Sequence, residues 1–154
     1  MLAVVLIVNA CGGVLTFASE LPPFSEGYNV AAWIKQNDQV DAFLIGSRDA
    51  QTSSVAGYLG RPIYYLECEC FGTFIVWNDK RKSLLRPEEF GRRLTEALLL
   101  AEQHDAILIR SRPVRGDDLT FGPTKVSVAL LQSFTNASTD ETFWIYRVRK
   151  KRPR

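Results

Sequence analysis

"FLIGSRDAQTSSVAGYLGRPIYYLECECFGTFIVWNDKR", residues 43–81, is the stretch that decides the fold class. It begins with a short apolar run, 43–46, that predicts a buried strand. The small side chains after Asp49 predict a helix, which Gly60 ends. An extended pattern rich in Ile, Tyr, Phe and Val follows over residues 63–77. A strand, a helix and further extended segments in this order predict an α/β domain.

Further elements are expected on both sides of this stretch. One helix begins near Ser25, a suitable N-cap residue, and the clearest helix begins at Pro87, because proline favours the first helical position. Strands are expected at 106–109, 125–134 and 142–149, and the last two are close enough for an antiparallel hairpin. The apolar stripe of the second helix consists of Phe90, Leu94, Ala97, Leu98 and Ala101. We therefore predict an α/β layered sandwich with a mixed, mostly parallel sheet that closes in a C-terminal antiparallel hairpin.

Length and charge limit the classes of protein that fit the chain. At 154 residues it suits one ordinary domain. Its net charge of +2 comes from the last eight residues, RVRKKRPR, whose six positive charges leave −4 for the remainder. The body is thus mildly acidic, which argues against a nucleic-acid partner. We divide the chain into an apolar segment at 1–20, an α/β domain at 21–146 and a basic tail at 147–154.

The first twenty residues, MLAVVLIVNACGGVLTFASE, are almost entirely apolar, and three interpretations compete for them. They form the end of a transmembrane helix, since 18 helical residues span about 27 Å against a hydrocarbon core of ~30 Å. Alternatively, residues 3–8 form a buried strand in the centre of the sheet, followed by a tight turn. A nucleotide-binding strand is disfavoured, because the G-x-G-x-x-G spacing is absent and Pro22 follows too soon for a long helix.

Three cysteines, an odd number, are not expected to form a disulfide framework. Cys68 and Cys70 are expected on one face of a strand as buried thiols. No second pair of Cys or His has metal-ligand spacing, so neither a metal nor another cofactor is expected. Glu67 and Glu69 are then expected to be solvated on the opposite face. A small thiol or carboxylate enzyme that uses residues 67–70 is kept as an alternative.

The loop after the first predicted strand holds the candidate ligand-binding residues. Open α/β sheets usually bind ligands beyond the carboxyl ends of their strands and at helix N-termini. Hydroxyl groups there would contact sugar hydroxyls or a phosphate, and an arginine would pair with an anion. The candidates are Ser47, Arg48, Asp49, Ser53 and Ser54. The competing interpretation is that Asp49 simply caps the helix.

No catalytic residue is assigned from the sequence. His104 is the one histidine, and it is expected in the last turn of a helix, where a histidine complements the helix macrodipole. A nucleophile system that needs a histidine would have to use this residue.

Three segments of the chain together resemble a known family. They are "PPFSEGYNVAAWIKQN", "LIGSRDAQTSSVAGYLGRPIYY" and "FGTFIVWNDKR". Their order is similar to the C-terminal soluble domain of bacterial polytopic membrane glycosyltransferases of the protein-mannosyltransferase and aminoarabinose-transferase-like kind. The resemblance covers about residues 21–106.

The resemblance implies a location and a role. It implies that residues 1–18 end a membrane helix and that an accessory domain follows outside the cytoplasm, in the periplasm. Its partners would be the membrane, a membrane-embedded glycosyltransferase core and, through that core, a polyprenyl-phosphate sugar. The family's catalytic acids lie in loops between early membrane helices, so none is transferred to this chain. We therefore expect a non-catalytic domain that contacts acceptor or glycan through residues 47–49.

Two further expectations concern the tail and the rival functions. The basic residues Arg149, Lys150, Lys151 and Arg152 are candidates for contact with an anionic membrane surface, although a solvated terminus explains them as well. A free-standing soluble α/β ligand-binding module is the main alternative to the accessory domain.

Overall fold

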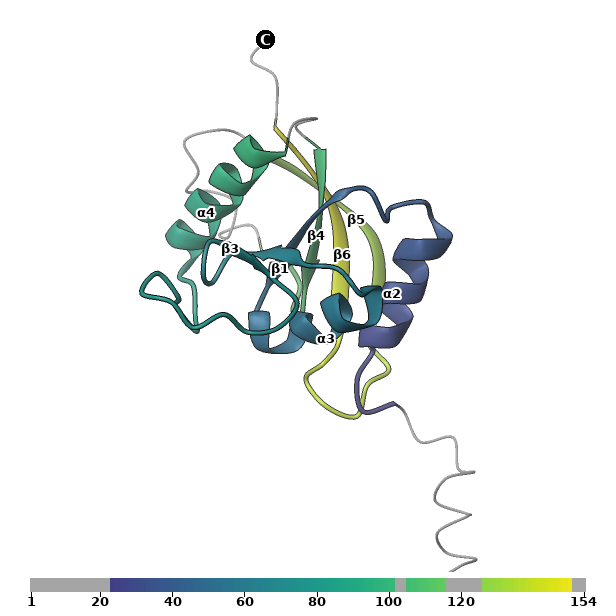
Figure 1. Ribbon diagram of the computed structural model, residues 1–154. Coiled ribbons are helices and arrows are strands. Elements are labelled where there is room, and N and C mark those ends of the chain that lie inside the picture. Colours follow the sequence, from purple (N-terminus) through teal and green to yellow (C-terminus); the bar gives the residue numbers. More distant parts are fainter. Residues whose placement is uncertain (1–22, 102–104, 116–125, 151–154) are drawn as a thin grey trace, which may run out of the picture.

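The computed structural model of the protein describes residues 23–101, 105–115 and 126–150 (Figure 1). The helices and strands in these ranges alternate as expected, so the predicted α/β class is confirmed. The helices are α2 (Gly27–Gln36), α3 (Asp49–Leu59) and α4 (Pro87–Leu100). The strands are β1 (Phe43–Ser47), β2 (Ile63–Tyr65), β3 (Cys70–Gly72), β4 (Asp105–Arg110), β5 (Val126–Phe134) and β6 (Phe143–Lys150).

The described strands form one mixed sheet in the order β3-β2-β1-β4-β6-β5. Strand β1 pairs in parallel with β2 and β4, whereas the β2–β3, β4–β6 and β5–β6 pairs are antiparallel. The mixed sheet and the C-terminal hairpin are thus confirmed. The expectation of a mostly parallel sheet is not confirmed, because β3 folds straight back on β2 and β6 of the hairpin lies directly beside β4.

Helices cover both faces of the sheet. Figure 1 shows α4 on one side and α2 with α3 on the other. The face under α2 and α3 is a buried apolar cluster that includes Val30, Val55 and Ile107. The face under α4 is a second cluster in which the predicted stripe residues Phe90 and Leu94 contact the sheet. The sheet thus lies between two separate apolar cores, one under α2 and α3 and the other under α4.

The segment between β2 and β3 differs from its prediction. One extended stretch was expected across residues 63–70, but β2 ends at Tyr65 and residues 66–69 form a turn. The turn needs a positive φ of 52° at Glu69, which places this residue in the left-handed region. Because the strand is interrupted, Cys68 and Cys70 do not share one strand face, and neither do Glu67 and Glu69.

The described chain enters and leaves the sheet at opposite ends. At the entry, the backbone N–H of Ser138 donates to the carbonyl of Pro23 at 2.9 Å, and the hydroxyl of Thr139 donates to that of Phe24 at 2.6 Å. The entry is therefore held by the β5–β6 connection. Strand β6 runs away from this connection to Lys150, at the top of Figure 1.

The interpretations of the first twenty residues lie outside the described residues. Within the described part, the six strands pair without a gap, so only the edges β3 and β5 are open to a further strand. No helix in the described ranges is both long and apolar enough to cross a membrane. The helix position of His104 also falls outside the described residues.

Candidate functional site

The carboxyl ends of β1 and β4 form a topological switch point. The connection through α3 takes the chain from β1 to β2 on one side, while β4 pairs with β1 on the other side. Ser47, the last residue of β1, is paired in register with Arg110, the last residue of β4. In open α/β sheets such a point is where ligands bind. Here it is called the carboxyl edge.

A buried carboxylate lies at the carboxyl edge. Glu67 follows β2 and is only 2% exposed. Its Oε1 accepts a hydrogen bond of 2.6 Å from the backbone N–H of Arg48 and one of 3.1 Å from the hydroxyl of Ser47. Its Oε2 is buried and has no hydrogen-bond partner in the described part of the chain. The side chain thus ties the end of β1 to the end of β2 while one oxygen stays unsatisfied.

Burial raises the pKa of the Glu67 carboxyl above its usual range, because the charged form is poorly solvated. The backbone N–H of Arg48 opposes this rise by donating to the carboxylate, and the nearby charge of Asp49 adds to it. Glu67 therefore holds its proton more tightly in the folded protein than in the unfolded chain.

Glu67→Gln tests this protonation through the pH dependence of stability. The contribution of the raised pKa is fully present below the ordinary value of 4.5 and is lost as the pH rises through the folded pKa. The glutamine carbonyl can keep both hydrogen bonds of Oε1 and carries no charge. We expect the variant to match the wild-type free energy of unfolding at pH 4 and to exceed it by about 1 kcal/mol at pH 8, because it removes a buried charge that is poorly solvated.

Chemical denaturation across that pH range measures the difference. Glu88→Gln, at an exposed glutamate in the first turn of α4, is the matched control and should bring no gain at pH 8. A Glu67→Gln variant that is less stable than wild type at pH 8 would show that the charged form is the one the fold stabilises.

The sequence offered the interpretation that Asp49 caps α3, but in the structure it does not. The N-cap residue of α3 is Arg48, in the left-handed region with φ 65°, and no side chain caps this end. Asp49 is instead 2% exposed and accepts two hydrogen bonds from Arg81, 2.7 Å from Nε and 3.0 Å from Nη2. The Arg81 guanidinium lies 4.1 Å from the centre of the Trp77 ring. The segment after β3 therefore covers the Asp49 side of the edge.

The structure brings three of the five predicted site residues together. Ser47, Arg48 and Asp49 gather around Glu67 and Arg81. In contrast, the hydroxyls of Ser53 and Ser54 donate to helix carbonyls three residues earlier, at 3.1 and 2.8 Å, so they are not part of the edge. The Arg48 side chain is about one-third exposed, and its guanidinium lies 3.8 Å from the carboxylate of Asp140.

Several residues of the edge were missed from the sequence. Arg110 is 2% exposed, with its guanidinium carbon 4.2 Å from the centre of the Phe90 ring, and Ser111 beside it is 4% exposed. The strand-end rule that selected Ser47 would have selected both, since they directly follow an apolar run. The hydroxyl of Tyr65 is also buried, and burial raises its pKa. No sequence signal distinguishes Glu67 or Arg81 from solvated residues.

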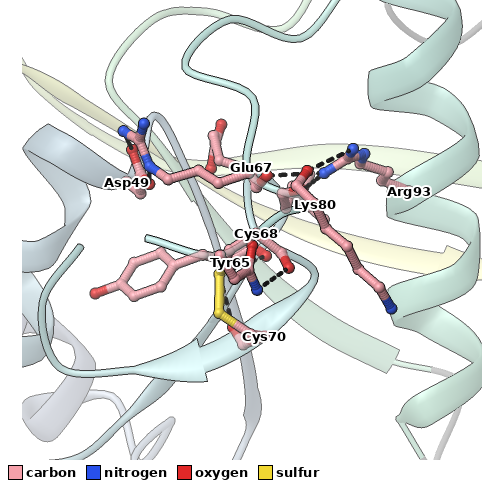
Figure 2. The surroundings of a disulfide bond; sticks show 10 residues. Asp49, Tyr65, Glu67, Cys68, Cys70, Lys80 and Arg93 are labelled. Carbon is pink, nitrogen blue, oxygen red and sulfur yellow. Dashed lines mark hydrogen bonds and ion pairs between the residues drawn. A yellow bond between two sulfur atoms is a disulfide. The ribbon is translucent and has the colours of Figure 1, made fainter. Parts of the chain in front are cut away.

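Cys68 and Cys70 are joined by a disulfide bond rather than present as free thiols. Figure 2 shows the bond in the turn between β2 and β3, with Arg93 reaching the turn from α4. The expectation of two buried thiols is thus wrong, because the turn brings the two sulfurs together where a strand would hold them apart. With both sulfurs bonded, neither cysteine can act as a thiolate nucleophile in this state.

Comparisons and metal ligands add no further assignment. No model of a known protein family matches the chain, and neither a curated protein nor a solved structure matches it. In the described ranges, no three His, Cys, Asp or Glu side chains are grouped as metal ligands. The fold and the edge thus define a mixed α/β domain with a polar, partly unsatisfied switch point, and the family resemblance rests on the sequence motifs alone.

Proposed function

We propose that residues 21–146 form a non-catalytic accessory domain of a membrane glycosyltransferase-like protein. In this proposal residues 1–20 are the anchor, the domain lies in the periplasm, and the carboxyl edge contacts an acceptor or a glycan. The sequence resemblance supports the class of protein. The gap-free sheet supports a domain whose fold does not depend on the anchor.

The observation that carries the proposal is the position of the chain entry. Pro23 and Phe24 are bonded to the β5–β6 connection, and Asp140 of the same connection lies 3.8 Å from Arg48. The entry and the carboxyl edge are therefore on the same side of the domain. An anchor that precedes Pro23 would turn this edge toward the membrane, where a membrane-embedded core presents its substrate.

The groups at the edge suit a hydroxyl-rich ligand. Arg48 is about one-third exposed and its contact with Asp140 is long, so its guanidinium remains accessible as a donor. Sugars are recognised by such convergent polar groups. Phe24, 72% exposed, and Tyr28, 63% exposed, lie beside the entry, and tyrosine is enriched where proteins meet lipid headgroups.

The described start of the basic tail, residues 147–150, is not part of this proposed contact. Strand β6 separates Lys150 from the β5–β6 connection by about 23 Å, at roughly 3.3 Å per residue. That separation exceeds the Debye length of ~8 Å at physiological salt. The surface near the entry would therefore attract Arg149 and Lys150 only weakly.

Deletion of residues 1–20 tests the proposal. We expect residues 21–154 to be soluble without detergent and to melt cooperatively, within a few degrees of the full chain, because both apolar clusters lie in the described residues. The full chain should pellet with membranes. Membrane fractionation and thermal melts of the two chains make the comparison, and aggregation or non-cooperative melting of the shorter chain would refute the anchor.

A further inference from the structure

A hollow of about 510 Å³ lies at the end of the sheet opposite the carboxyl edge, where strands β1 and β4 begin. Its floor is apolar and includes Phe43 and Ile107, the first residue of β1 and an early residue of β4. Its rim is polar and includes Arg61, Arg147 and Asp41. Small-molecule sites in proteins usually measure about 300–1,000 Å³, so the size of the hollow fits, and its polar rim suits a charged ligand.

The described lining of this hollow is positively charged. Arg61 comes from the connection between α3 and β2, while Arg147 and Arg149 are two apart on β6 and so point to the same face. Asp41 is the one carboxylate among the described lining residues. Like charges held close together repel one another, and an anionic ligand between them would remove that repulsion.

Arg147 gives the clearest sign of a missing partner. It is half-buried, and in the described part of the chain its guanidinium makes no hydrogen bond and no ion pair, although its backbone is paired in the sheet. A partly buried guanidinium without a counter-ion is a favourable donor for an anion. Arg61 is held in place at the rim by a hydrogen bond of 3.3 Å from Nη2 to the carbonyl of Ala42, which uses one of its five donors. Arg149 adds a further positive charge to the lining.

We propose that this hollow binds the phosphate group of an anionic ligand through Arg61 and Arg147. The planar guanidinium fork matches the oxygens of a phosphate, and the apolar floor would contact the organic part of the ligand. The hollow is at the other edge of the sheet from Glu67 and Asp49, so this site is independent of the proposed function. Failure of either proposal leaves the other intact.

Titration of the full 154-residue chain with inorganic pyrophosphate, followed by calorimetry, tests the site. We expect saturable binding that weakens at least tenfold in Arg147→Gln and in Arg61→Gln, because each removes a charge-assisted contact. Arg86→Gln is the matched control. It removes the same charge from an exposed arginine at the far end of α4, about 21 Å away along that helix, and should leave binding unchanged. Equal melting temperatures would show that the variants are folded.

A second arm identifies the source of the phosphate. The same variants are mixed with vesicles made with and without phosphatidic acid, and only the binding that depends on this lipid is compared, since an anchor at residues 1–20 would bind both kinds of vesicle alike. If the protein binds pyrophosphate and Arg147→Gln abolishes that binding, the ligand is a free phosphorylated molecule. If it binds only the vesicles and Arg147→Gln abolishes that binding, the ligand is a lipid headgroup. If neither pyrophosphate nor the vesicles bind, the proposal is overturned. It is also overturned if Arg86→Gln weakens binding as much as Arg147→Gln does, since the attraction would then be due to overall charge.

Discussion

Replacing Arg93 with methionine is expected to lower the free energy of unfolding by about 3–5 kcal/mol, the cost of breaking a buried charged network. Arg93 is 4% exposed. Its Nη1 donates to the carbonyls of Leu66 and Glu67, both at 2.8 Å, and its Nη2 donates to that of Lys80 at 3.1 Å. Its Nη2 also pairs with the carboxylate of Glu89 at 2.8 Å. Methionine fills the space but removes a donor from each of these acceptors, and the carbonyls of Leu66 and Lys80 keep no other side-chain donor in the described part of the chain.

Arg92 is the matched control because it directly precedes Arg93 in the same helix and is far more exposed. It is 45% exposed and pairs with Glu96 one turn later and, at 3.1 Å, with Glu69 of the turn between β2 and β3. Arg92→Met should therefore cost less than about 1 kcal/mol, as exposed ion pairs do. Urea denaturation of both variants measures the difference. If the two variants lose equal stability, Arg93 does not hold the turn between β2 and β3.

The fold was predictable wherever periodicity and end signals agreed. The apolar stripe after Pro87 gave a helix that the structure places on one face of the sheet, and Gly60 ends α3 with φ 69° as expected. The short connection between the last two predicted strands indicated the hairpin. These signals involve residues close together in the sequence, so a single sequence is enough to detect them.

The end of β2 and the side chains that hold the turn after it were not predictable, because they depend on contacts between residues that are far apart in the sequence. Nothing in residues 63–70 indicates that the strand stops at Tyr65, since the residues of the turn are as compatible with a strand as their neighbours. The turn is held instead by Arg93 of α4 and by the backbone N–H of Lys82, which donates to the carbonyl of Glu67 at 2.9 Å. The disulfide of Cys68 follows from that turn.

The candidate site was predictable only in part, for the same reason. The strand-end rule located Ser47, Arg48 and Asp49, because it needs only one strand and the helix after it. The partners of these residues, Glu67 and Arg81, lie 20 and 32 residues away along the chain. Arg93 did leave a signal: it lies on the stripe of α4, three residues after Phe90, and a charge within an apolar stripe needs buried partners.

Removing Arg81 should show whether the carboxyl edge depends on the Asp49–Arg81 pair. The two side chains are 2% and 9% exposed, with Nε 2.7 Å from the carboxylate. Arg81→Met leaves Asp49 buried with no counter-ion, which is expected to cost about 3–5 kcal/mol of unfolding free energy. Lys82→Met is the control, because its pair with Glu89 is half exposed and should contribute below about 1 kcal/mol.

The double variant separates a lost pair from lost packing. Asp49→Asn combined with Arg81→Met removes both charges, so it should be clearly more stable than Arg81→Met alone, since the unpaired buried charge is gone. Denaturation of the two single variants, the double variant and the wild type gives the coupling energy. If the double variant loses as much as the sum of the single variants, the two side chains are not coupled. Arg81 would then stabilise the edge through its contact with Trp77 rather than through Asp49.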